Sequence, residues 1–212
     1  TKEGTGQPSV DETIKALPAE QESKPERVGI ARADSNDGKA RPLFLDTSMS
    51  KVGFVGSKVT KDHEGSFETF DGKALLNGYS PVSFEVTVDT ASVVTQYEKL
   101  TAHLKNEDFF FASKYPEARF VSRQVLRGGQ GSATHTVIGE LTLRAVTKKI
   151  TFPISLVTTD AGATGLAEFK INRKDFGMVY AGMADDLIND QVLLKLNLAF
   201  LDEKYRQDKA KR

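Results

Sequence analysis

The stretch Val192 to Phe200, with the sequence VLLKLNLAF, decides the fold of this chain. From Val192 onward every second side chain is large and apolar, whereas Lys195 and Asn197 lie between apolar residues. A period of two places successive side chains on opposite faces of a β-strand. The stretch therefore predicts a long strand with one face in a core, and its place late in the chain predicts that it closes a sheet.

The same alternation occurs in earlier segments of the chain. Their apolar positions are Val52 and Phe54; Phe84, Val86 and Val88; Val137, Leu141 and Leu143; Ile150, Phe152, Ile154 and Leu156; and Phe169 and Ile171. Turn-forming residues separate these segments at Asp71-Gly72, Asn77-Gly78, Gly128-Gly129 and Asp160 to Gly162. Short turns of this kind join antiparallel strands.

One helix interrupts the predicted strands. Gln96 to Leu104 carries Tyr97 and Leu100 at helical spacing, with Ser92 and Thr95 as candidate caps. The expected fold class is therefore all-β with a short helical excursion. About eight strands suit either a sandwich or a barrel, and periodicity does not choose between them.

Composition divides the chain into three parts. Residues 1–41 mix Gly, Pro, Ser and charged side chains, so we expect a flexible polar leader or tether with at most a short helix near Asp11 to Leu17. Residues 42–202 carry the β pattern, and residues 203–212 form a charged C-terminal tail. A leader without any role beyond spacing remains the simpler interpretation.

Charge and cysteine content exclude several classes of protein. The chain has 29 basic and 29 acidic side chains, so no net field draws it to nucleic acid. It has no cysteine, which removes disulfides and thiolate chemistry. No stretch is apolar for long enough to span a bilayer as a helix. We expect no nucleic-acid partner.

Residues suited to catalysis or metal binding are few. The sequence has no nucleophile elbow, no zinc-binding helix and no phosphate-binding loop. His63 and His103 are each interpreted as structural or surface residues rather than as an acid, a base or a ligand. Asp185-Asp186, near Asp190, lacks the pattern of a calcium loop and is interpreted as an acidic turn. We expect no enzyme activity, no cofactor and no metal; a lipid-modifying barrel that uses His63 or His103 is the enzymatic alternative.

The inward faces predict an apolar interior. With 13 Phe and no Trp, that interior would carry almost no hydrogen-bonding groups. The candidate ligand-binding residues are Val52, Phe54, Phe84, Val86, Phe120, Val137, Leu141, Phe152, Ile154, Phe169 and Ile171. The alternative is an ordinary packed core, and the sequence alone does not tell the two apart. The helix around Tyr97 to Leu104 and the cluster Phe109 to Phe111 would either cap or widen one mouth of the barrel, or simply pack over the barrel end.

Several motifs resemble one known family in both order and sequence. They are Ser50 to Phe54 (SKVGF) continuing to Lys58-Val59-Thr60, His63 to Phe67 (HEGSF), Lys99 to Phe110 (KLTAHLKNEDFF), Lys114 to Phe120 (KYPEARF), Gly139 to Pro153 (GELTLRAVTKKITFP) and Ile171 to Gly177 (INRKDFG). Together they make the region from Phe44 to Phe200 similar to the YceI-like family of polyisoprenoid-binding proteins. Ala145 departs from the Gly usual there, which concerns the turn and not the fold.

The resemblance implies an extended, lipocalin-like, eight-stranded antiparallel barrel with a long apolar pocket. It implies non-enzymatic binding, transport or storage of a polyisoprenoid or isoprenoid quinone. It also implies export to the periplasm or beyond, with residues 1–41 as a tether near a membrane. A homodimer is kept open, and so is a stress-response or interaction module whose barrel is packed and lipid-free.

Three arginines have two interpretations each. Arg119, Arg144 and Arg173 either pair with nearby carboxylates such as Asp108 or Asp175, or one of them meets a ligand head group.

Overall fold

The computed structural model describes residues 40–184 and 186–210, and these form a β-barrel with short helical segments. The strands are β1 (Arg41–Leu45), β2 (Lys51–Lys58), β3 (Asp62–Phe67), β4 (Phe70–Asn77), β5 (Ser80–Asp89), β6 (Val93–Thr95), β7 (Glu117–Arg127), β8 (His135–Leu143), β9 (Val146–Thr158), β10 (Gly162–Asn172), β11 (Gly182–Met183) and β12 (Asp186–Asp202). The helices are η1 (Thr90–Ser92), α1 (Glu98–Lys105), η2 (Arg173–Phe176) and α2 (Glu203–Ala210). The predicted leader lies outside the described residues up to residue 39; residues 203–210 of the predicted charged tail form α2, and residues 211–212 lie outside the described residues.

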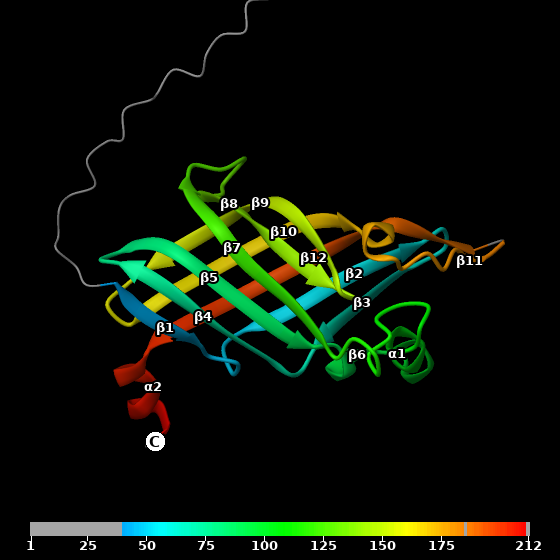
Figure 1. The fold of residues 1–212 in the computed structure, drawn as a ribbon, viewed down its shortest axis with the longest axis horizontal. Coiled ribbons are helices and arrows are strands. Elements are labelled where there is room, and N and C mark those ends of the chain that lie inside the picture. The colour runs from blue at the N-terminus through cyan, green and yellow to red at the C-terminus, as the bar shows by residue number, and fades with distance from the viewer. Residues whose placement is uncertain (1–39, 185, 211–212) are drawn as a thin grey trace, which may run out of the picture. The chain divides into compact units, whose positions relative to one another are not determined.

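Eight antiparallel strands close into a ring in the order β1, β4, β5, β7, β8, β9, β10 and β12, because β12 also pairs with β1 (Figure 1). The closing strand is the one that the alternating segment predicted, and Leu194 and Leu196 face the same core as Leu198. The structure thus decides for a barrel over a sandwich. A closed ring has no free edge strands, which protects the sheet from pairing with other chains.

Three strands of the barrel are interrupted at one level. β12 pairs with β1 through residues 200–202 and with β2 through residues 188–197, so β1 and β2 form one broken strand. β3 and β4 form a second, and β5 and β6 a third, because β3 pairs with β2 and β6 with β3. The pieces β2, β3 and β6 extend the wall beyond the ring.

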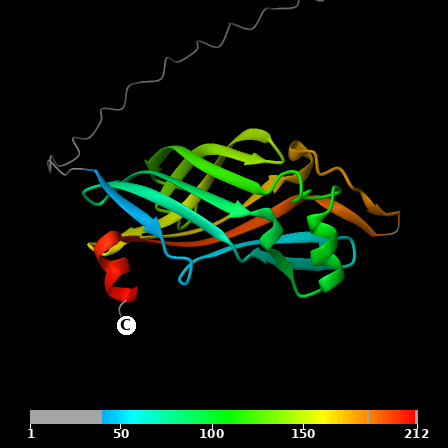
Figure 2. The same cartoon turned by 60° about the horizontal axis from the view of Figure 1, so that its bottom comes forward.

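The helix α1 lies beside this extension (Figure 2). Among the described strands, β6 pairs with β3 alone, and the chain then enters α1 before returning as β7. Leu104 of α1 and Phe109 of the turn that follows it are buried in the core, so this connection between β6 and β7 packs against the barrel. No helix within residues 40–184 and 186–210 is long and apolar enough to cross a membrane.

Two local expectations are corrected. Asp71-Gly72 is not a turn but part of β4, and a side chain at Gly72 would place its Cβ 2.5 Å from the carbonyl oxygen of Glu85. Glycine is needed there because β5 approaches closely, not because the chain reverses. Helix α1 begins two residues later than expected, and Tyr97 at its N-cap makes no side-chain cap bond; Thr95 instead bonds to Thr101 at 3.0 Å.

The conformation of the turn between β8 and β9 shows why glycine would suit position 145 better than the alanine found there. Arg144 and Ala145 have φ values of 52° and 59°. Two consecutive residues with positive φ make a type I′ hairpin, whose twist matches that of the strands it joins. Glycine adopts this conformation without steric cost, whereas Ala145 does not.

Candidate functional site

The barrel interior contains an apolar cavity of about 180 Å³. It is lined by residues from β2, β3, β5, β7, β8, β9, β10 and β12, from α1 and η2, and from the turns that follow these two helices. For comparison, a cavity of about 150 Å³ lined by Leu, Ile and Phe stays dry and binds benzene. The interior is therefore not completely filled, which the sequence alone left open.

Nine of the eleven predicted lining residues border this cavity. They are Val52, Phe54, Phe84, Val86, Phe120, Leu141, Phe152, Phe169 and Ile171. The alternation therefore predicted the inward faces correctly. Whether these residues contact a ligand stays a prediction.

The other two predicted residues lie elsewhere in the core. Val137 and Ile154 are 0% and 2% exposed, so both point inward as expected. Ile154 borders a separate gap of about 20 Å³ together with Phe84 and Phe200, and Val137 borders neither space. Periodicity identifies the face of a strand, but it does not say where along the barrel the packing leaves room.

Several lining residues were not predicted from strand periodicity. Leu104, Phe109 and Phe110 enter from α1 and its following turn, whereas Met178 enters from the segment after η2 and Ile188 from the start of β12. The three consecutive phenylalanines were a visible signal for the first group. Met178 follows the αL residue Gly177 in an irregular segment, where no period exists. These residues define the mouth of the cavity.

Aromatic rings control the width of the cavity. Phe152 and Phe169 stack with centroids 4.1 Å apart, and Phe120 lies 5.4 Å from both Phe152 and Phe84. Near the mouth, Phe110 lies 6.3 Å from Phe54. Phe110, Phe120 and Phe169 are only partly buried.

Arg173 is a buried structural cation at the mouth. Its guanidinium donates to the carbonyl oxygens of Met178, Asn189 and Ile188, and it pairs with Asp190 at 3.2 Å. Burial lowers the pKa of Arg173 from its ordinary value, and Asp190 opposes that shift. These bonds tie η2 to the start of β12. The partner is Asp190 rather than the Asp175 suggested by sequence proximity.

The other two arginines also have protein partners. Arg119 of β7 pairs with Glu85 of the neighbouring strand β5 at 2.6 Å. Arg144 donates to the carbonyl oxygen of Phe109 at 2.6 Å, which joins the β8–β9 turn to the mouth. Asp108, the other suggested partner, instead bonds to His103 at 2.9 Å.

The histidines occupy three different environments. His103 packs edge-on against Phe109 and Tyr180, beside its bond to Asp108. His63 lies on β3 with its ring edge-on to Tyr97, and burial, followed by the charges of Lys61 and Lys58, lowers its pKa. Burial and then Arg127 lower the pKa of His135. Both groups are therefore held neutral at neutral pH.

Of the predicted acidic turn, Asp185 lies outside the described residues, and Asp186 and Asp190 belong to β12, where partners account for their charge. Asp186 pairs with Lys58 at 3.1 Å and accepts from Thr60 at 3.0 Å, and these bonds hold its pKa below the usual value. Asp190 pairs with Arg173 and Lys174. Within the part of the chain that the structure describes, no three acidic, His or Cys side chains gather as a metal site would need.

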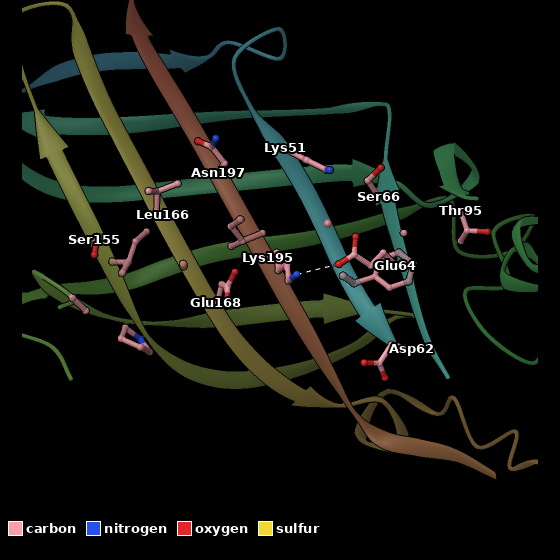
Figure 3. Close-up of a pocket in the computed structure, with 18 of the residues that line it drawn as sticks. Lys51, Asp62, Glu64, Ser66, Thr95, Ser155, Leu166, Glu168, Lys195 and Asn197 are labelled. Atoms are coloured by element: carbon pink, nitrogen blue, oxygen red, sulfur yellow. Dashed lines mark hydrogen bonds and ion pairs between the residues drawn. The ribbon is translucent and has the colours of Figure 1, made fainter. Parts of the chain in front are cut away.

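A second, wider concavity lies on the outer face of the sheet. It measures about 950 Å³ and crosses β9, β10, β12, β2 and β3. Figure 3 shows its side chains, among them Glu168 and Lys195, with the bond from Lys195 to Glu64 at 3.2 Å. This trough is open and mixes charged and polar side chains with apolar ones, so it suits an apolar ligand less than the almost wholly apolar interior does.

The fold and cavity define a class of protein: a small antiparallel barrel that encloses an apolar space. Residues 44–200 match the YceI-like domain, and the chain belongs to the YceI-like family. A UPF0312 protein of Pseudomonas fluorescens is 33% identical over 154 residues, which cover 66% of this chain and 74% of that protein. The chain spans only 57 to 62% of other relatives from Pseudomonas putida and Escherichia coli.

Solved structures agree on the architecture. BcnA of Burkholderia cenocepacia has a TM-score of 0.65 and 25% identity, covering 73% of this chain and 98% of that one. A domain from Saccharophagus degradans, described as polyisoprenoid-binding and implicated in plant cell wall breakdown, has a TM-score of 0.60 and 15% identity, covering 77% and 99%. The second likeness shows the fold alone. The predicted family and the predicted barrel are both confirmed.

Proposed function

We propose that this protein binds the isoprenoid chain of a lipid or quinone in its barrel interior and carries or stores it without chemical change. The observation that supports the proposal most strongly is the cavity, which is lined almost wholly by apolar side chains within a closed barrel. The description of the Saccharophagus degradans domain as polyisoprenoid-binding points to the same ligand class.

The free energy of binding would come from apolar burial. At about 0.8 kcal/mol per methylene, each isoprene unit contributes roughly 3 to 4 kcal/mol before the entropy of ordering the chain is subtracted. The cavity of about 180 Å³ is smaller than the pockets of ~300 Å³ or more that enclose drug-sized ligands. A long chain therefore enters only if Phe110, Phe120 or Phe169 moves. The ligand is selected by its width and flexibility.

Export to the periplasm, a membrane near the N-terminal segment and a second copy of the chain belong to this proposal as its cellular setting. A native precursor whose N-terminus carries no export signal would contradict both the export and the tether.

Binding is favoured over catalysis by the residues at the mouth. The bond between His103 of α1 and Asp108 of the following turn lies at the protein surface, because both side chains are at least one third exposed. Arg173 is occupied by carbonyl oxygens and a carboxylate. The alternative that remains is an interaction or stress-response module whose barrel contains no lipid.

Extraction of lipid from purified protein tests the proposal. Mass spectrometry of an organic extract should show a co-purifying isoprenoid. In Leu194→Trp, a large ring replaces a half-buried residue that lines the cavity, and the lipid should be lost. The matched control Leu166→Trp places the same ring on the outer face, where Leu166 is 57% exposed, and should retain it. An empty extract, together with no uptake of a fluorescent apolar probe, would favour the packed module.

A further inference from the structure

One position at the cavity mouth leaves space that the fold does not use. Gly56 of β2 lines the cavity, and a Cβ built on it would meet no atom within 4 Å. The neighbouring pair behaves differently. Gly65 of β3 faces Phe54, whose ring would lie 2.3 Å from a Cβ on Gly65, so an aromatic ring covers that glycine. The space over Gly56 is therefore open, whereas the space over Gly65 is filled by the ring of Phe54.

The residue opposite Gly56 in the ladder is His63. Directly opposed residues of antiparallel strands place their side chains on one face, with Cβ positions about 5 Å apart. His63 thus projects from the same face of the sheet as the space over Gly56; Gly56 borders the cavity, and His63 lies next to it in the ladder.

His63 also has a hydrogen-bonding atom without a partner. Its Nδ1 is buried, and no described residue of the protein donates to it or accepts from it. Most buried polar atoms in proteins have a partner, and an unpaired one costs about 1 to 3 kcal/mol. An unpaired ring nitrogen beside an open space is the arrangement expected of a site that a ligand completes.

We propose that the space over Gly56, flanked by His63, receives the uncharged oxygen of the isoprenoid head group, either a prenol hydroxyl or a quinone carbonyl. This inference rests on the proposed function and specifies it. The chain would fill the apolar cavity beyond Gly56, and the imidazole would donate to the carbonyl or exchange a hydrogen bond with the hydroxyl.

The surrounding charges favour a neutral head group over a phosphate. Lys58 is held by Asp186 at 3.1 Å, and Lys61 donates to the hydroxyl of Tyr97. Arg173 is bonded to three carbonyl oxygens and to Asp190. Each of these cations already has a partner, whereas a buried phosphate needs cations that are free to pair with it. The lowered pKa of His63 agrees, because it keeps the imidazole neutral.

Binding of four C20 isoprenoids by delipidated protein tests the inference: a prenol, its monophosphate, a quinone with a side chain of that length, and the hydrocarbon without oxygen. Displacement of a fluorescent apolar probe gives each dissociation constant. The variant His63→Phe keeps the ring against Tyr97 and removes the nitrogen. It should weaken the prenol or the quinone roughly 3- to 10-fold and leave the hydrocarbon unchanged, as the loss of one hydrogen bond predicts.

Two further variants make the result specific. Gly56→Val fills the open space and should weaken the same oxygen-bearing ligand by a similar factor. His135→Phe makes the matched change on β8, which pairs with β7 and β9 and not with β2 or β3, and should change nothing. If the effect is confined to the prenol or to the quinone, the site is supported and its preferred oxygen is known.

The failing outcomes are distinct. Equal weakening of hydrocarbon and oxygen-bearing ligands by His63→Phe, or no weakening at all, would overturn the head-group site while the proposed function stood. Tighter binding of the monophosphate that depends on His63 would overturn the neutral head group. If none of the four ligands binds the unaltered protein, the proposed function itself fails.

Discussion

Phe152 of β9 and Phe169 of β10 stack face to face, with ring centroids 4.1 Å apart and ring planes 9° apart. Both rings border the cavity, but Phe152 is 1% exposed whereas Phe169 is only partly buried. The pair therefore joins the packed part of the core to the open part.

Truncation of the two rings should have unequal costs. Phe152→Ala removes a fully enclosed ring and should lower the free energy of unfolding by about 3 to 5 kcal/mol. Phe169→Ala should cost less, because its ring has fewer packed neighbours to lose. Urea denaturation of both variants gives the comparison, and an equal or reversed order would contradict the location of the cavity.

The β8–β9 turn offers a stabilising substitution. Ala145→Gly relieves a residue at φ 59° and should raise the free energy of unfolding by about 0.5 to 1 kcal/mol, net of the greater freedom of glycine in the unfolded chain. Ala74→Gly, within β4, should lower it. Thermal unfolding of the two variants measures both, and a destabilised Ala145→Gly would mean that the turn is not of type I′.

Substitution by alanine should lower the free energy of unfolding at one glycine of the barrel and leave it nearly unchanged at another. Gly72→Ala brings a methyl group 2.5 Å from the carbonyl oxygen of Glu85 and should cost about 1 to 3 kcal/mol, because the β5 backbone must shift. Gly56→Ala meets open space and should be nearly neutral. Chemical denaturation of the pair decides, and a costly Gly56→Ala would show that the space is already filled.

Stability should fall as the solution becomes mildly acidic. Burial lowers the pKa of His63 and of His135 below 6.5, so between that value and their folded pKa values the unfolded chain binds more protons than the folded one. The free energy of unfolding is therefore highest above about pH 6.5 and declines as the pH falls through this window. Replacing both histidines with Phe should flatten the decline.

Carboxylates act in a separate window. The hydrogen bond from Lys73 lowers the pKa of Glu85 from 4.5, and the bond from Lys58 lowers that of Asp186 from 3.8, so their contributions are lost only under more acidic conditions. Unfolding followed from pH 7 to 5 isolates the histidines. An unchanged slope in the double variant would contradict their burial.

Strand faces could be predicted from this sequence because alternation is a local property. Val52, Leu141 and Phe169 all point inward as their neighbours indicated. The position of a residue along the barrel depends on strands far apart in sequence. The neighbours of Ile154 in the chain therefore could not show that it borders the smaller gap instead of the cavity. Gly72 was mistaken for a turn residue because the approach of β5 is invisible in its own segment.

The mouth was the hardest part to predict. Arg173 binds the carbonyl oxygen of Ile188, 15 residues away, and His63 lies opposite Gly56 only because β2 and β3 pair in one register. The phenylalanines after α1 were visible as a cluster, but their contact with the cavity depends on where the helix docks. Ring closure itself was undetermined by periodicity, and it required the pairing of β1 with β12.

The central claim is that an apolar ligand lies inside the barrel, and one fluorescence measurement tests it most directly. The chain has no Trp, so Phe120→Trp provides a single reporter in the cavity lining and Leu166→Trp provides one beside the outer trough. Titration with a brominated isoprenoid chain should quench the inner reporter saturably and leave the outer one bright. Quenching of the outer reporter alone, or no saturable quenching of either, would contradict the claim.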